Sequence, residues 1–325
     1  MALERWLARL AAKKVHVFQR CLPLMLLASC LGVLLPNMTQ SHQIITHEVL
    51  SNYQSERTQI EVLLPETLDP ARSRVVYVLP VGAHLSEQRE YGNVLLELQR
   101  LGLHNKNNVI FVKPTFSATP WYGDHAWDPA IRQESHVLNV VLPFIDTTYS
   151  TATTPNARHL LGFSKSGWGA WSLLLRHPDL FTRALAWDAP MMLDRVGPWE
   201  TSRIFGTQEN FEAYKVSNLV RTRGAKLGAG TRLFLMGHGV FREHNASMAE
   251  LLGTLQIPHQ YEDGPRRRHA WVSGWLADAV DLLVSPGATS HSIVTELPSA
   301  QADDQGRARL GLLEHSGPRQ ASVLR

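Results

Sequence analysis

The chain has 325 residues, of which 44% are hydrophobic and 19% are charged, and its formal net charge is +3. This composition excludes an intrinsically disordered chain and a chain wholly embedded in a membrane. The small net charge gives no support to nucleic-acid binding, and we expect no nucleic-acid partner. A chain of this length can bury a full hydrophobic core.

The N-terminal segment contains an apolar run, LPLMLLASCLGVLL from Leu22 to Leu35, after a basic stretch. The run is shorter than the ~20 residues of a membrane span but suits the core of a signal peptide. Residues 27–30 also resemble a lipoprotein signal ending in Cys30, which with Cys21 completes the chain's cysteines.

We therefore expect residues 1–40 to form a signal- or anchor-like segment. It would make the protein exported or associated with the cell envelope, including the membrane, with a lipoprotein as the narrower alternative. The other alternative is a cytoplasmic protein in which these residues are an uncleaved anchor or lie before the working start. From about Ser285 the sequence is rich in Ser, Ala, Gly and Gln, which predicts a disordered tail over residues 285–325.

Strand-like and helix-like stretches alternate through the predicted catalytic domain, residues 41–284. The expected strands are residues 44–50, 58–64, 74–80, 108–112, 158–161, 184–187, 231–236 and 259–262. Expected helices lie around residues 94–101, from Asp128-Pro129 to 145, 166–177, 211–220, 248–255 and from about Ala270. This order predicts an α/β fold with a mostly parallel eight-stranded sheet flanked by helices on both faces.

A turn of small residues joins the fifth expected strand to the next helix and reads Gly162-Phe163-Ser164-Lys165-Ser166-Gly167. A serine on such an elbow has a strained backbone and an exposed hydroxyl, and the helix N-terminus favours negative charge there. The usual second glycine is replaced by Ser166, which is small enough to fit. The pattern predicts Ser164 as a nucleophile; the alternative is an ordinary glycine-containing turn.

The segment from Gly162 through Gly169 into residues 176–181 (RHPDLF) resembles the putative esterase family, which includes esterase D-type hydrolases. Gln133-Glu134-Ser135 and the closing His-containing motif are also similar, so the resemblance spans roughly residues 58–284. It implies an α/β-hydrolase fold, an esterase activity and a nucleophilic role for Ser164.

His269 lies in the loop after the last expected strand, where a triad in the chain order Ser, acid, His has its base. It is the predicted general base; the alternative is a surface-loop histidine. His238 and His244 are either cleft residues or, as we favour, solvated loop residues. The spacing of His, Cys and acidic residues gives no convincing metal site, and we expect neither a metal nor a cofactor.

The acid of the triad stays open. Most relatives have it after the seventh strand, where this chain reads GHGVFRE over residues 237–243 and has no Asp. The candidates are Asp188, Glu243 and Asp263. We favour Asp188, because an apolar strand that ends in an acid directly before Ala-Pro is poorly explained by solvation alone.

The predicted oxyanion hole uses the backbone N–H of Lys165 and a second donor from residues 81–83, with Gly82 permitting close approach of the main chain. A simple turn glycine is the alternative for Gly82. Trp121 and Tyr122 lie in an aromatic loop after the fourth strand, and they form either a substrate wall or a local mini-core.

Together these features predict a serine esterase that cleaves a small-molecule carboxylic ester through an acyl-enzyme on Ser164, with His269 activating water for deacylation. An acyltransferase would use the same residues. A catalytically silent scaffold that acts as a binding module is the alternative from another class. The run Arg266–Arg268 is interpreted as a solvated loop.

Overall fold

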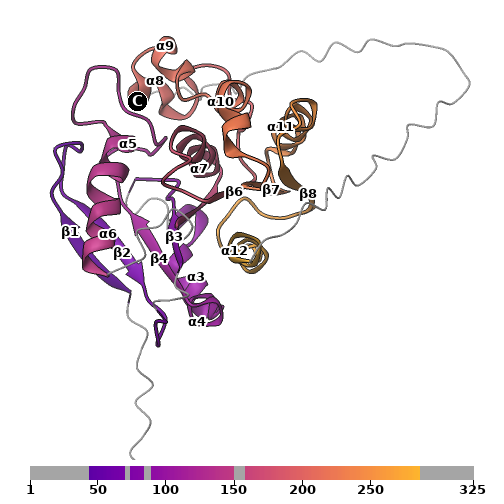
Figure 1. Ribbon diagram of the computed structural model, residues 1–325. Helices are drawn as coiled ribbons and strands as arrows, with labels where there is room; N and C mark the ends of the chain where they lie inside the picture. Colours follow the sequence, from indigo (N-terminus) through magenta and orange to yellow (C-terminus); the bar gives the residue numbers. More distant parts are fainter. Residues whose placement is uncertain (1–43, 70–73, 84–88, 150–157, 286–325) are drawn as a thin grey trace, which may run out of the picture. The chain divides into compact units, whose positions relative to one another are not determined.

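The computed structural model describes residues 44–69, 74–83, 89–149 and 158–285 (Figure 1). The predicted N-terminal signal or anchor segment, with the membrane association inferred from it, lies outside these residues, as does nearly all of the predicted C-terminal tail. None of the helices in the described part has the length and apolar character needed to cross a membrane.

Eight strands form one sheet in the order β1-β2-β4-β3-β5-β6-β7-β8. The first two strands and the β2–β4 pair are antiparallel, and every other pair is parallel, which confirms the predicted mostly parallel sheet. The strands are β1 (Ile45–Val49), β2 (Thr58–Leu63), β3 (Arg74–Val78), β4 (Val109–Pro114), β5 (Arg158–Phe163), β6 (Arg183–Trp187), β7 (Leu233–His238) and β8 (His259–Arg266).

Helices cover both faces of the sheet, as predicted (Figure 1). Side chains that alternate along a strand point to opposite faces, so Val75 and Tyr77 of β3 join one core cluster while Val76 and Val78 join the other. One face carries α3 (Val94–Arg100), α4 (Leu103–Asn107) and α12 (Leu276–Val284); the other carries α5 (Gln133–His136), the π-helix η1 (Val137–Val141), α6 (Leu142–Thr148), α7 (Lys165–Arg176), α10 (Val216–Arg223) and α11 (Arg242–Thr254).

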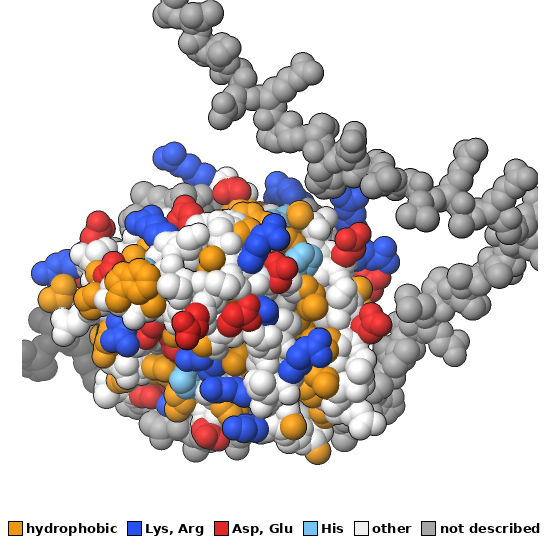
Figure 2. All heavy atoms as spheres, turned by 90° about the horizontal axis from the view of Figure 1, so that it is seen from above, with side chains coloured by type: hydrophobic (Ala, Val, Ile, Leu, Met, Phe, Trp, Pro, Cys, Tyr) orange, Lys and Arg blue, Asp and Glu red, His pale blue; other side chains and the backbone are white. Residues whose placement is uncertain are grey.

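The connection between β6 and β7 contains several short helices. They are η3 (Pro198–Glu200), α8 (Thr201–Phe205), α9 (Gln208–Glu212), α10 and η4 (Gly224–Leu227). The single helix predicted around residues 211–220 is therefore two helices, α9 and α10, separated by a turn. Seen from above (Figure 2), the molecule presents hydrophobic, basic and acidic side chains intermixed rather than one charged field.

Two predicted helix starts are wrong. Asp128 accepts a hydrogen bond from the N–H of Ala130 (2.9 Å), so it stabilises a turn, and the helix begins only at Gln133. The predicted helix from Ala270 begins at Leu276, because the N–H of Trp271 donates to the carbonyl of Tyr91 (2.9 Å) instead of starting a helical turn. In both cases backbone contacts with distant segments override the local capping pattern.

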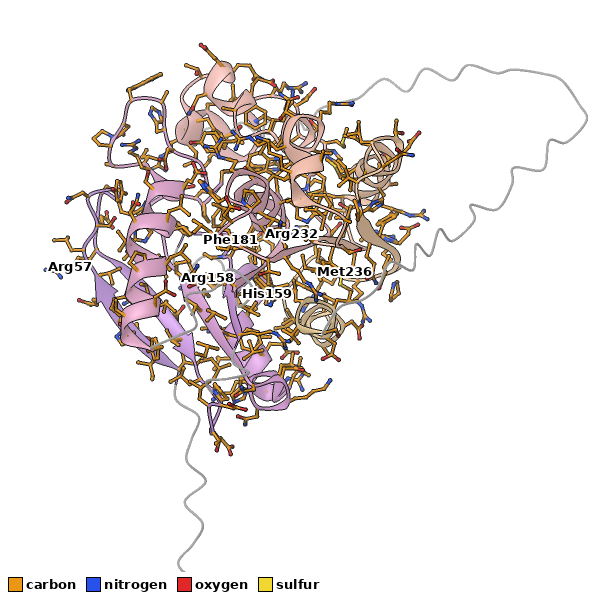
Figure 3. All side chains as sticks on the ribbon, in the orientation of Figure 1. Arg57, Arg158, His159, Phe181, Arg232 and Met236 are labelled. Atoms are coloured by element: carbon orange, nitrogen blue, oxygen red, sulfur yellow. The ribbon has the colours of Figure 1, made fainter. Side chains whose placement is uncertain are left out.

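The N-terminal ends of the parallel strands carry buried polar side chains (Figure 3). The Arg232 guanidinium donates to the carbonyls of Pro178, Phe181 and Thr182, which fixes the turn before β6. His159 is buried beside Arg158 at the start of β5, and neither of its ring nitrogens has a hydrogen-bond partner among the described residues. Burial and the charges of Arg183 and Arg74 lower the pKa of His159 to about 3.

This buried histidine predicts that acidification destabilises the fold. The unfolded chain binds a proton at His159 below pH ~6.5, whereas the folded chain does so only near pH 3, so stability is lost as the pH falls between these values. From pH 7 to pH 5 we expect this group to lower the unfolding free energy by about 2 kcal/mol. Urea unfolding at both pH values should show a smaller difference in His159→Leu; an equal difference would contradict the assignment.

Candidate active site

Ser164 lies at the sharp turn between β5 and α7, with φ 53° and ψ −131°. A positive φ is strained for a residue with a side chain, and such strain is typical of functional positions. The elbow is possible because residue 162 is glycine: a Cβ there would lie 2.2 Å from the carbonyl oxygen of Ser166. Strand, turn and helix thus hold the Ser164 side chain at the carboxyl end of β5, as the sequence predicts for a nucleophile.

Ser166, which replaces the usual second glycine, closes the elbow. Its buried hydroxyl accepts a hydrogen bond from the N–H of Phe163 (3.0 Å) and donates to the carbonyl of the same residue (2.9 Å). The departure from the common pattern therefore satisfies two backbone groups at the end of β5 and leaves the turn intact.

Gly169, one turn further along α7, lies against the ring of Tyr122. An added Cβ would come within 2.0 Å of the ring, so we expect Gly169→Ala to destabilise the fold by about 1–3 kcal/mol. The matched control is Gly253→Ala in α11, where nothing lies within 4 Å and the gain in helix propensity should stabilise by up to about 1 kcal/mol. Urea unfolding of both variants measures the contrast; stabilisation by both would show that Tyr122 moves aside freely.

Asp188 and His269 are joined directly, Oδ2 of the aspartate lying 2.5 Å from Nδ1 of the histidine. Asp188 is fully buried and also accepts hydrogen bonds from the N–H groups of Val240 and Phe241. Burial disfavours the carboxylate, but the hydrogen bonds from His269 and from the N–H groups of residues 239–241 outweigh it and lower the pKa of Asp188. An ionised carboxylate only accepts, so the proton of a neutral His269 lies on Nδ1.

The other two acid candidates lie elsewhere. Glu243 is exposed in the first turn of α11, and Asp263 pairs with Arg242 and lies 3.2 Å from Nδ1 of His238. Among the three candidates, the structure places Asp188 against His269.

The loop after β7 supplies backbone donors instead of the carboxylate expected there. Gly239 in this loop lies so close to Asp188 that a Cβ would come 2.7 Å from Oδ2. Sequence analysis missed this support for Asp188; the pattern Gly237-His238-Gly239 was the available signal.

The serine elbow and the histidine loop meet at the carboxyl ends of β5 and β6. The N–H of Ser164 donates to the carbonyl of Trp187 (3.0 Å), which directly precedes Asp188. The ring of Phe163, which directly precedes Ser164, packs against the His269 ring at a centroid distance of 4.6 Å. The residues predicted as nucleophile, base and acid thus come from three segments that contact one another.

The predicted oxyanion donors lie on neighbouring strands. Lys165 is the first residue of α7, where the backbone N–H groups of a helix have no partner within it. Gly82 follows β3, which pairs with β5, and the N–H of Leu79 donates to the carbonyl of Leu161 (2.9 Å). Both positions therefore belong to the carboxyl edge that carries Ser164, and their role stays a prediction.

Trp121 and Tyr122 are fully buried, so the substrate wall predicted for them is wrong and the alternative of a local core is what the structure shows. The indole of Trp121 packs against Trp168 at 5.4 Å and donates to the carbonyl of Trp199. The Tyr122 hydroxyl donates to the carbonyl of Pro80 (2.5 Å), next to the predicted oxyanion loop.

Sequence analysis missed two aromatic side chains near the histidine, Trp199 and Phe241. Trp199 is 48% exposed, and its ring lies 5.6 Å from that of Phe241, which in turn lies 5.7 Å from that of His269. Trp199 has a positive φ of 50°, and the available signal was an aromatic residue in a Gly-Pro turn after β6. No cluster of three or more potential metal ligands occurs within the described ranges.

Comparison with known proteins gives one family and several solved structures. The model of the Esterase family, described as "Putative esterase", matches residues 51–250, more than half of the chain. No curated protein matches. A ferulic acid esterase is similar in structure, with 20% identity and a TM-score of 0.56 over 74% of this chain and 96% of that chain.

Two structures from Staphylococcus aureus are also similar, each over 75% of this chain and 99% of the other. One is the S-formylglutathione hydrolase FrmB, with 16% identity and a TM-score of 0.59. The second is FphF, a fluorophosphonate-binding serine hydrolase, with 17% identity and a TM-score of 0.60. At these identities the likeness concerns the fold, and it supports the α/β-hydrolase architecture predicted from the sequence.

Proposed function

The chain belongs to the Esterase family and is a carboxylic ester hydrolase of the serine type, and from this premise we propose that Ser164, His269 and Asp188 are its catalytic residues. The observation that carries the proposal is the hydrogen bond between Asp188 and His269, beside the strained Ser164 elbow. The substrate is a small-molecule carboxylic ester.

The first half of the reaction acylates the serine. The Ser164 hydroxyl attacks the ester carbonyl carbon while Nε2 of His269 takes its proton, and Asp188 stabilises the imidazolium that forms. The tetrahedral intermediate then collapses. The bond to the alcohol breaks, His269 returns the proton to the leaving alkoxide oxygen, and the acyl group stays on Ser164.

The second half repeats these steps with water. His269 removes a proton from a water molecule that attacks the acyl carbonyl, and Ser164 leaves with the proton returned by the imidazolium. In both halves the negative oxygen of the intermediate is stabilised by the N–H of Lys165 and by a donor in the loop around Gly82.

The geometry at Asp188 supports catalysis over a silent binding scaffold. The scaffold alternative rested on the missing acid after β7, and Asp188 at the end of β6 supplies a carboxylate to His269 instead. A fully buried carboxylate with several hydrogen-bond donors is costly to build and is expected where a charge has a task.

The proposal is tested with a fluorescent fluorophosphonate, which phosphonylates activated serines; FphF, a structural neighbour, is described as binding such a compound. The wild-type protein should become labelled and Ser164→Ala should not. Equal labelling of both proteins, or a wild type that hydrolyses esters without reacting, would contradict the assignment.

A further inference from the structure

A cavity of about 410 Å³ opens beside His269 and does not include the buried aromatic loop. Its lining comes from the loop after β7 and from the end of β8, and consists of Gly239, Val240, Arg266, Arg267, Arg268 and His269. Three consecutive arginines thus share one cavity with the proposed general base. The solvated-loop interpretation of this run does not take account of that position.

The backbone that carries these arginines is fixed. Arg266 pairs with His238 at the end of β8, and the N–H of Arg267 donates to the carbonyl of His238 (2.9 Å). The Arg267 guanidinium donates to the carbonyl of Ser273 (3.2 Å), so this side chain has a structural role. The cavity wall is therefore formed before any ligand enters, which lowers the entropic cost of binding.

Arg266 and Arg268 are exposed, and neither has a carboxylate partner in the part of the chain that the structure describes. The nearby carboxylate of Asp263 is held by Arg242 and lies close to His238, and Glu262 accepts from the side-chain amide of Gln260. The positive charge of the cavity is thus not neutralised by its neighbours. Guanidinium groups recognise carboxylates and phosphates through paired hydrogen bonds.

The chemistry assigns the cavity to one half of the substrate. The imidazole that protonates the departing alcohol must lie next to it, so the alcohol portion of the ester lies on the His269 side of the carbonyl. Resting on the proposed function, we infer that the cavity binds the alcohol portion of the substrate and that this portion carries an anionic group, a carboxylate or a phosphate. Arg266 and Arg268 are its specificity-determining residues.

The test compares acetyl esters that differ only in the charge of the alcohol. These are methyl 4-acetoxybenzoate, which is neutral, 4-acetoxybenzoate and 4-acetoxyphenyl phosphate. In the double variant Arg266→Gln/Arg268→Gln we expect kcat/KM for an anionic ester to fall about tenfold, mainly through KM, with less than about twofold change for the neutral ester. High salt should weaken the wild-type preference in the same direction.

The matched control is Arg57→Gln/Arg221→Gln, which removes the same charge from exposed arginines elsewhere. Arg57 lies beside β1 and β2, at the opposite end of the sheet from β7 and β8, as its position relative to Met236 in Figure 3 shows. This control should keep the preference for anionic esters, because the loss of a distant charge is screened.

The outcomes separate the anions and the hypotheses. Selective loss with the benzoate assigns a carboxylate, selective loss with the phosphate ester assigns a phosphate, and loss with both assigns a general anion subsite. Equal loss with the neutral ester, an equal effect of the control variant, or no preference in the wild type would overturn the inference. Failure of the wild type to cleave the neutral ester by way of Ser164 would instead refute the proposed function.

Discussion

Ser164→Ala should lower kcat/KM for 4-nitrophenyl acetate by at least about 10³-fold, because no other group in the proposed mechanism can form the acyl-enzyme. The residual rate would come from oxyanion stabilisation and binding alone. The loss is chemical rather than structural, since the Ser164 hydroxyl makes no capping bond to α7. Steady-state release of 4-nitrophenolate measures the effect, and circular dichroism checks the fold.

The matched control is Ser172→Ala, the same substitution on the same helix. Ser172 is buried, and its hydroxyl donates to the carbonyl of Tyr214 (3.1 Å), so its loss should cost about 1 kcal/mol of stability. Its turnover should stay within about twofold of wild type, since a single distant hydrogen bond contributes to stability and not to the reacting atoms. Comparable losses of turnover in the two variants would point to a folding defect and contradict the role of Ser164.

Asp188→Asn should lower kcat by about 10⁴-fold, the effect known for this change in other triads. The carboxylate accepts from Nδ1 of His269 and leaves Nε2 free to take the serine proton; an amide that donates to Nδ1 favours the wrong tautomer. The variant also replaces a charge that accepts N–H groups from the loop after β7, so some stability is lost as well. Single-turnover kinetics on folded protein isolates the chemical effect.

The two rejected acids serve as controls for this experiment. Glu243→Gln changes an exposed side chain, and Asp263→Asn removes the surface pair with Arg242, which is worth at most about 1 kcal/mol. Both variants should keep kcat within about threefold of wild type. A large loss in either one, together with near-normal turnover of Asp188→Asn, would move the acid to that residue.

The sheet and the elbow could be predicted because their signals are local. Buried parallel strands form continuous apolar runs, and the elbow needs small residues at fixed offsets, such as Gly162. The order of strands and helices then implies where the functional loops meet. The position of His269 after the last strand followed from the same order.

The acid and the substrate wall could not be fixed in this way because they depend on contacts across the fold. The sequence does not show that residues 239–241 offer N–H groups to Asp188, which is what selects it over Glu243 and Asp263. Likewise, an aromatic pair in a loop looks the same whether it faces solvent or packs inward, and Trp121 packs inward against Trp168. Composition alone cannot distinguish a wall from a core.

Identification of the residue that carries the acyl group during turnover tests the central claim most directly. With 4-nitrophenyl trimethylacetate, whose bulky acyl group slows deacylation, acid quenching and peptide mass mapping should find one trimethylacetyl group per protein, on Ser164. The rapid release of 4-nitrophenolate should match that amount. A matching burst with the acyl group on another residue would contradict the account.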